Sequence, residues 1–143
     1  MATSISDDLR YPIGRFEFAP PVTPHARRAA VADIAALPTR LRAAVAGLDV
    51  RQLDTPYRPE GWTVRQLVHH VADSHINGII RLKLALTEDS PRITGYDENA
   101  WARLADAALD VEVSLSLLDG LHARWAALYA SVEGEQWARS FFH

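Results

Sequence analysis

Residues 62–89 read WTVRQLVHHVADSHINGIIRLKLALTED, the longest stretch of the chain with sustained helical periodicity. Thr63 followed by Gln66 has the form of a capping box, in which each side chain satisfies a backbone N–H at the start of a helix. A helix from Thr63 to Leu86 is roughly 36 Å long at 1.5 Å per residue. Its apolar residues form a broad arc, so we expect it to be packed on more than one side.

A narrow polar stripe remains on this helix. It consists of His70, Ser74, Asn77 and Arg81, spaced four, three and four residues apart, which places them one above another. The stripe either faces solvent, as charged and amide side chains usually do, or lines a wet pocket between helices. In the second interpretation His70 holds a metal ion and the other three orient it or a substrate. Periodicity alone does not choose between the two.

Three further histidines fall on predicted helices. His75 lies near the middle of the apolar arc and is interpreted as a core imidazole bonded to a carbonyl or carboxylate, with metal ligation as the alternative. His69, one turn before Asp73, could form a helix-surface pair with it. Because adjacent helical residues point about 100° apart, at most one of His69 and His70 faces a given ion. His122 is interpreted as a surface group or as a partner behind a metal ligand.

The chain's 143 residues fit one domain, residues 1–143, with an extended arm over residues 1–22. A net charge of −3 without a concentrated basic face argues against a nucleic-acid partner. No apolar run is long enough to cross a bilayer, and no signal peptide is recognisable, so we expect a cytoplasmic protein without a membrane partner. There is no cysteine, so any metal must be bound by histidine and carboxylate.

Two more long helices are predicted on either side of this segment in the sequence. The first begins at Thr23-Pro24 and stops at Gly47, and Pro38 is expected to kink or split it. The other runs from Val111 to about Val132. Since strand alternation is absent throughout, the chain is predicted to be all-helical.

A short connecting helix, DENAWARLAD at residues 97–106, is predicted to be capped by Asp97, with Trp101 and Leu104 facing inward. Asp97 and Glu98 have the chemistry of catalytic carboxylates. However, acids at a helix start are also what the helix dipole favours, so we interpret both as structural.

Three segments resemble the DinB-like superfamily, and within it the YfiT-type metal-dependent hydrolases, which include bacillithiol transferases. They are DTPYRPEGWTVRQLVHHVADSHINGIIRLKLALTED, PRITGYDENAWARLAD and EVSLSLLDGLHARWAALYASV. The resemblance extends from Tyr11 to His143. It implies an up-down-down-up four-helix bundle that holds Zn²⁺ or Ni²⁺ through three histidines, the first of which is His70.

The resemblance also implies two further ligands, an H-x-x-x-H pair on a fourth helix. This sequence carries no such pair, and His143 does not replace it. We therefore expect the bundle's three long helices and its short connecting helix, without the C-terminal fourth helix. One imidazole binds a divalent ion weakly, so the other ligands would come from further residues or from a second chain.

The first functional hypothesis is a metal-dependent thiol S-transferase or hydrolase, in which the divalent ion lowers the pKa of a bound thiol or water. His70 is the expected ligand, with Ser74, Asn77 and Arg81 as candidates for the wall of a small-molecule pocket. Arg81 could pair with a carboxylate on a low-molecular-weight thiol cosubstrate. The alternative hypothesis is a non-catalytic helical module that buries its open face against a partner or a copy of itself, as a homodimer.

Overall fold

The computed structural model describes Leu9, residues 11–17 and residues 22–143. Three long helices dominate it: α2 (Pro24–Val45), α4 (Val64–Thr87) and α6 (Val111–Ala130). Short elements connect them, namely α3 (Val50–Leu53), α5 (Glu98–Trp101) and the 3-10 helices η1 (Ala105–Ala108) and η2 (Gly134–Ala138). Within these residues β structure is limited to two isolated bridges. The all-helical prediction is confirmed.

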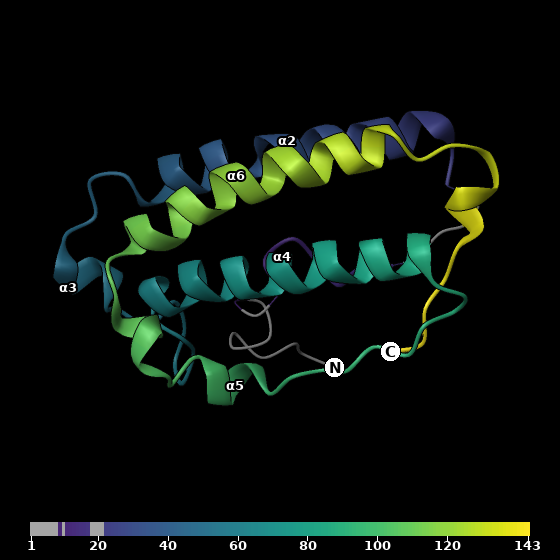
Figure 1. Ribbon diagram of the computed structural model, residues 1–143. Helices are drawn as coiled ribbons and strands as arrows, with labels where there is room; N and C mark the ends of the chain where they lie inside the picture. The colour runs from purple at the N-terminus through teal and green to yellow at the C-terminus, as the bar shows by residue number, and fades with distance from the viewer. Residues whose placement is uncertain (1–8, 10, 18–21) are drawn as a thin grey trace, which may run out of the picture.

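Helix α6 packs against both α2 and α4. Figure 1 shows that α4 and α6 run in the same direction and that α2 runs the opposite way. The connecting segment that contains α5 and η1 lies along α4 on the side turned away from α6 (Figure 1), and η1 contacts α4 directly. Helix α4 is therefore covered on two sides, as its broad apolar arc predicts.

Side-chain caps fix where the long helices begin. At the start of α4, the Gln66 N–H donates to the Thr63 hydroxyl at 3.1 Å and the Thr63 N–H donates to the Gln66 side chain at 3.0 Å. This is the reciprocal capping box that the sequence predicts. Thr23 caps α2 in the simpler way, by accepting the Ala26 N–H at 3.1 Å.

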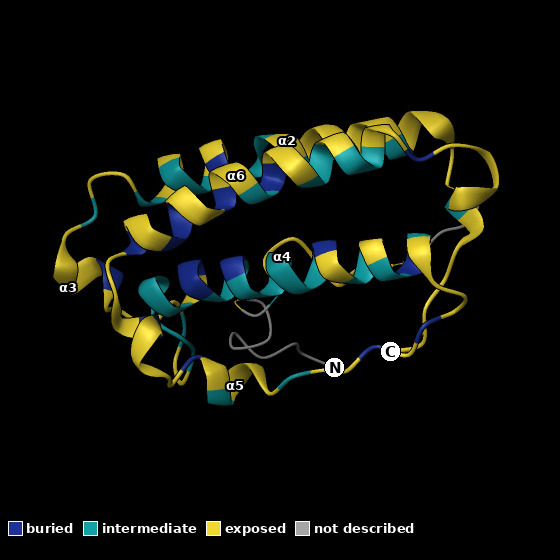
Figure 2. Ribbon diagram, in the orientation of Figure 1, coloured by how far each residue is buried: buried dark blue, intermediate teal, exposed yellow. Residues whose placement is uncertain are grey.

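The best-buried part of the structure lies where the first halves of α4 and α6 meet. Val68 is 1% exposed and Leu118 is 0% exposed, and Val68 packs with Leu115, Val111 and Leu53 in one cluster. Figure 2 shows buried residues concentrated on α4 and α6, whereas Pro38 is the only buried residue of α2. Burial of this apolar surface is the main force that holds α4 on α6.

Pro38 was expected to kink or split the first helix; it does not split it, because α2 runs unbroken over the 22 residues Pro24–Val45 with Pro38 inside it. A proline at position 38 has no N–H to donate to the Ile34 carbonyl four residues earlier. The Nδ1 atom of His122 on α6 donates to that carbonyl instead, at 2.6 Å. A neighbouring helix therefore supplies the hydrogen bond that the proline removes.

The connecting helix is shorter than predicted, and its two apolar side chains do not face inward. Trp101 is 38% exposed and Leu104 is 56% exposed. Asp97 caps one turn by accepting the Ala100 N–H at 2.9 Å, after which the chain turns into η1. The Trp101 ring packs against Tyr96 in a tilted arrangement, with ring centroids 4.3 Å apart, in place of the core contact.

The predicted N-terminal arm is described only at Leu9, residues 11–17 and Val22; its other residues lie outside the described part. The Gly14 N–H donates to the Tyr11 carbonyl at 2.9 Å, which closes a turn. No helix in the described residues combines the length and apolarity that are needed to cross a bilayer.

Candidate metal centre and polar pocket

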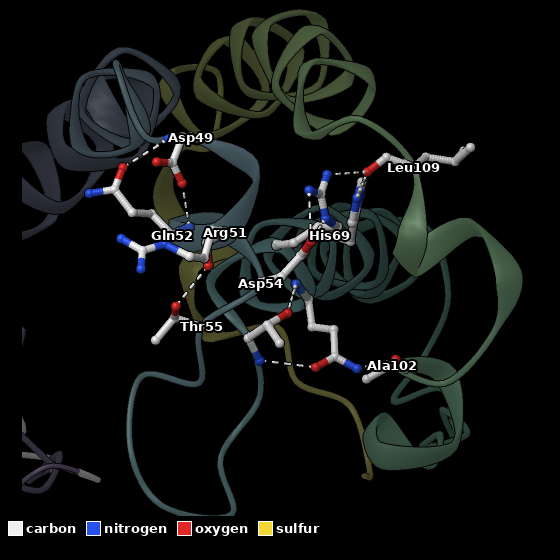
Figure 3. A network of polar contacts seen from close by, with 11 residues as sticks. Asp49, Arg51, Gln52, Asp54, Thr55, His69, Ala102 and Leu109 are labelled. Atoms are coloured by element: carbon white, nitrogen blue, oxygen red, sulfur yellow. Dashed lines mark hydrogen bonds and ion pairs between the residues drawn. The ribbon is translucent and has the colours of Figure 1, made fainter.

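The adjacent histidines of α4 have different environments. His69 is buried, and it joins α4 to α6 through its Nδ1 atom, 2.7 Å from the Ser114 hydroxyl. Its Nε2 atom lies 3.1 Å from the Leu109 carbonyl (Figure 3). Because a carbonyl only accepts, a neutral His69 carries its hydrogen on Nε2. The interpretation of His69 as a surface partner of Asp73 is therefore wrong.

His70 is half-buried against the Trp62 ring, with ring centroids 4.5 Å apart. Trp62 is itself held in place, because its Nε1 atom donates to the Asn99 side chain at 3.1 Å. One turn before His70, the Gln66 side chain donates to the Ala102 carbonyl at 2.7 Å. The His70 end of the stripe therefore lies under the connecting segment and not in open solvent.

The ring nitrogens distinguish His70 from the other three histidines of α4 and α6. Both ring nitrogens of His69 and of His122 have a hydrogen-bond partner, and one of those of His75 has. Neither nitrogen of His70 has a partner among the described residues. His70 is thus the histidine of this set in which neither ring nitrogen is hydrogen-bonded, so either one can bind an ion in the matching tautomer.

A polar pocket of about 230 Å³ lies one turn further along the stripe. Ser74 and Arg81 line it from α4, and Tyr96, Glu98 and His143 line it from the opposite side. His143 is held there because the Phe142 N–H donates to the Pro91 carbonyl and the Ile93 N–H donates to the Phe142 carbonyl, both at 2.9 Å. The C-terminal residues are therefore pinned beside the connecting segment.

Two of the three predicted pocket residues lie together in this pocket, and the third does not. Asn77 donates from its side chain to the Asp73 carbonyl at 2.9 Å, so it bonds to its own helix. Tyr96 and His143 were not predicted as pocket residues. Glu98 was weighed as a catalytic carboxylate and interpreted as a structural acid at a helix start, a position that it occupies as the first residue of α5.

Burial raises the pKa of two groups beside the stripe, the Asp73 carboxyl and the Tyr96 hydroxyl. It raises the pKa of the Asp73 carboxyl; the charge of Asp106 adds to this, and His70 and His69 oppose it. Burial and the negative charge of Glu98 also raise the pKa of Tyr96, against smaller opposing effects of Ser74 and Arg81. The Tyr96 hydroxyl is therefore a neutral hydrogen-bond donor at pH 7.

A second histidine pair crosses the bundle. Nδ1 of His75 lies 2.7 Å from Nε2 of His122, which is 1% exposed. Because His122 donates from Nδ1 to Ile34, its neutral form accepts at Nε2, and the hydrogen between the rings sits on His75. Burial, with the charges of His122 and His70, lowers the pKa of His75 to about 4. The surface interpretation of His122 is wrong, and His75 bonds to a histidine in place of a carbonyl or carboxylate.

The described residues supply one suitable metal donor and not a complete ligand set. Among them, no group of three His, Cys, Asp or Glu side chains is arranged to hold an ion. A tetrahedral zinc site needs three or four protein ligands. His70 fits as one of them, so the ligand assignment remains a prediction.

Comparison with known proteins finds one matching family and relatives that share one name. Residues 33–143 match the DinB superfamily. A Bacillus cereus protein named "Putative metal-dependent hydrolase" is 52% identical over 137 residues, which span 96% of this chain and 79% of that protein. A Bacillus anthracis protein of the same name is 51% identical over the same shares.

Among solved structures, YfiT from Bacillus subtilis superposes with a TM-score of 0.92 at 44% identity, over 95% of this chain and 78% of that one. It is described as "a probable metal-dependent hydrolase with an unusual four-helix bundle topology".

Proposed function

Because this chain belongs to the DinB superfamily, we propose that it forms the His70 side of a metal-dependent hydrolase or thiol S-transferase site. The observation that carries the proposal is the free imidazole of His70. It is the one histidine of α4 and α6 with both nitrogens uncommitted, and a polar pocket begins one helical turn away. The names of the relatives support metal dependence in general.

In this proposal His70 binds Zn²⁺ or Ni²⁺. The remaining ligands come either from residues outside the described part of the polypeptide or from a second copy of it. The bound ion supplies a Lewis acid that lowers the pKa of a water or thiol. The residues of this chain do the positioning. Trp62 fixes the plane of the His70 ring, and it is held in turn by its bond to Asn99.

The polar pocket would receive the small-molecule substrate or thiol cosubstrate. Arg81 offers a fixed positive charge, which suits a carboxylate on a low-molecular-weight thiol. The hydroxyls of Ser74 and Tyr96 offer neutral donors, and Glu98 offers an acceptor. Such a lining orients a polar ligand through several directed bonds.

A titration of the untagged chain with Ni²⁺, followed by NMR, tests the ligand assignment. Ni²⁺ is paramagnetic and broadens signals of nearby protons, and the indole N–H of Trp62 reports on the neighbouring His70 ring. We expect this signal to broaden first in the wild type, and the broadening to be lost in His70→Ala. His25→Ala, at an exposed site on α2, is the matched control and should behave as wild type. Broadening of the Trp62 signal that survives His70→Ala would refute the assignment.

A second candidate function rests on a different feature, an apolar groove of about 450 Å³ lined by α2, α4 and α6. Ile34, Leu37 and Leu41 line it together with Trp125. A non-catalytic module would bury this groove against a copy of itself as a homodimer. Sedimentation of wild type and Leu37→Glu distinguishes the two functions. A metal-free dimer that Leu37→Glu dissociates favours the module, and a monomer in both variants excludes it.

A further inference from the structure

A third cavity, a cleft, lies at the far end of the bundle from His70. The later halves of α4 and α6 form two of its sides, and η2 with the residues after it forms the third. Its volume is about 420 Å³, within the range of small-molecule binding sites in proteins. The lining is mostly apolar, with a few polar groups that converge on it.

Three aromatic rings line one side of the cleft in a row. The rings of Trp125 and Tyr129 are 6.1 Å apart at 22°, and those of Tyr129 and Trp137 are 6.2 Å apart at 6°. Gly78 makes room for the first ring, since a Cβ at that position would lie 2.5 Å from Trp125. A glycine in the middle of a helix is unfavourable, and here it allows a tryptophan to pack directly on the backbone of α4.

The polar groups of the cleft are cationic or neutral. Arg81 and Arg139 both line it, and no acidic residue does. Neither guanidinium forms an ion pair within the described residues, although Arg139 donates to the Glu88 backbone carbonyl at 3.0 Å. Glu98 shares the polar pocket with Arg81, and Asp89 and Glu135 share an outer depression with Arg139, all beyond ion-pair distance. Inside the cleft the charge is positive.

The wall also contains a hydrogen-bond donor that is not used. Among the described residues, Nε1 of Trp125 is the only fully buried side-chain nitrogen or oxygen without a hydrogen-bond partner. Burial raises the pKa of the nearby Tyr129 hydroxyl, and the Trp125 side chain acts in the opposite direction. The two groups do not reach hydrogen-bonding geometry, so we treat Nε1 as unpaired.

We propose that this cleft binds a small-molecule carboxylate with an aromatic or branched apolar body. The body packs against the Trp125, Tyr129 and Trp137 wall, and the carboxylate pairs with Arg81 and Arg139, whose planar guanidinium groups match its geometry. Arg81 also lines the polar pocket, so the two cavities adjoin. The proposal goes beyond the metal site and does not depend on it, because binding needs no ion.

The test uses 3-phenylpropanoate, with its uncharged amide and acetate as matched probes, added to the full chain in the presence of a chelator. Indole N–H signals in ¹H–¹⁵N spectra locate binding. We expect the propanoate to shift the Trp125 and Trp137 signals in a saturable way. The amide should bind about tenfold more weakly, the ratio typical of one charge-assisted hydrogen bond. Acetate should not saturate.

Two variants and a control identify the carboxylate partner. Arg81→Gln and Arg139→Gln should each weaken propanoate binding about tenfold and leave amide binding unchanged. Arg103→Gln, at an exposed site outside the cleft, should change neither. Equal affinity for propanoate and amide would overturn the anion site, and so would shifts confined to Trp62 and Trp101. An absence of saturable binding at millimolar ligand would overturn the cleft as a site for this class of ligand.

Discussion

Substitution of His122 by phenylalanine tests the link between α6 and the proline of α2. Phenylalanine keeps a planar ring in a site that is 1% exposed, so little cavity forms. It removes both hydrogen bonds of His122, the one at 2.6 Å to the Ile34 carbonyl and the one at 2.7 Å to His75. The Ile34 carbonyl then has no donor, because residue 38 of its own helix is proline.

The expected loss of stability follows from these two bonds. Each buried polar group left without a partner costs about 1–3 kcal/mol. His75 can recover part of this by changing its tautomer, and the Ile34 contact is only partly buried. We therefore expect His122→Phe to lower the free energy of unfolding by about 2–3 kcal/mol, as measured by urea denaturation.

A double-mutant cycle isolates the role of the proline. Pro38→Ala restores an N–H four residues after Ile34, so the carbonyl regains a donor within its own helix. In the Pro38→Ala background, His122→Phe should cost about 1–2 kcal/mol less than in the wild type. His25→Ala, at an exposed site, is the control and should not couple to Pro38. An equal cost of His122→Phe in both backgrounds would refute the reasoning.

Three further predictions concern α4. The pKa of His75 is lowered to about 4, so the unfolded chain binds a proton at this residue before the folded chain does as the pH falls below 6.5. The free energy of unfolding should therefore decline between pH 6.5 and 4, by about 1–2 kcal/mol after allowance for solvent screening. His75→Gln should flatten this part of the curve of stability against pH. Thr63→Ala removes half of the capping box and should cost about 1 kcal/mol in urea denaturation, whereas an unchanged midpoint would show that the cap adds nothing. Gly78→Ala gains about 1 kcal/mol of helix propensity but overlaps Trp125, which costs about 1–3 kcal/mol, so a net stabilisation would contradict the contact described above.

The helices and their starts were predictable because their signals are local. A capping box at Thr63 and a cap at Thr23 each involve residues three apart, so the sequence contains the whole interaction. Helix geometry alone also predicts that the side chains of His69 and His70 point in different directions. Which of them is buried depends on Ser114 and Leu109, which lie 45 and 40 residues further along the chain.

The features that were missed depend on residues brought together by the fold. Pro38 predicts a broken helix when α2 is considered alone, and the compensating donor comes from His122, 88 residues after Ile34. The polar pocket acquires Tyr96 and His143 only because the chain returns past Arg92 at Phe142. No periodicity within either segment marks these residues. Ser74 and Arg81 line one pocket, as the stripe on α4 indicates, since those two belong to one helix; their role in binding stays a prediction.

The most direct test of the proposed metal site is the position of the ion itself. Anomalous X-ray scattering from crystals of the chain grown with Zn²⁺ locates the metal without reference to activity. We predict a zinc peak about 2.0–2.1 Å from a ring nitrogen of His70, beside the Trp62 ring. Zinc bound in the crystal at other histidines, with both nitrogens of His70 still free of metal, would contradict the account.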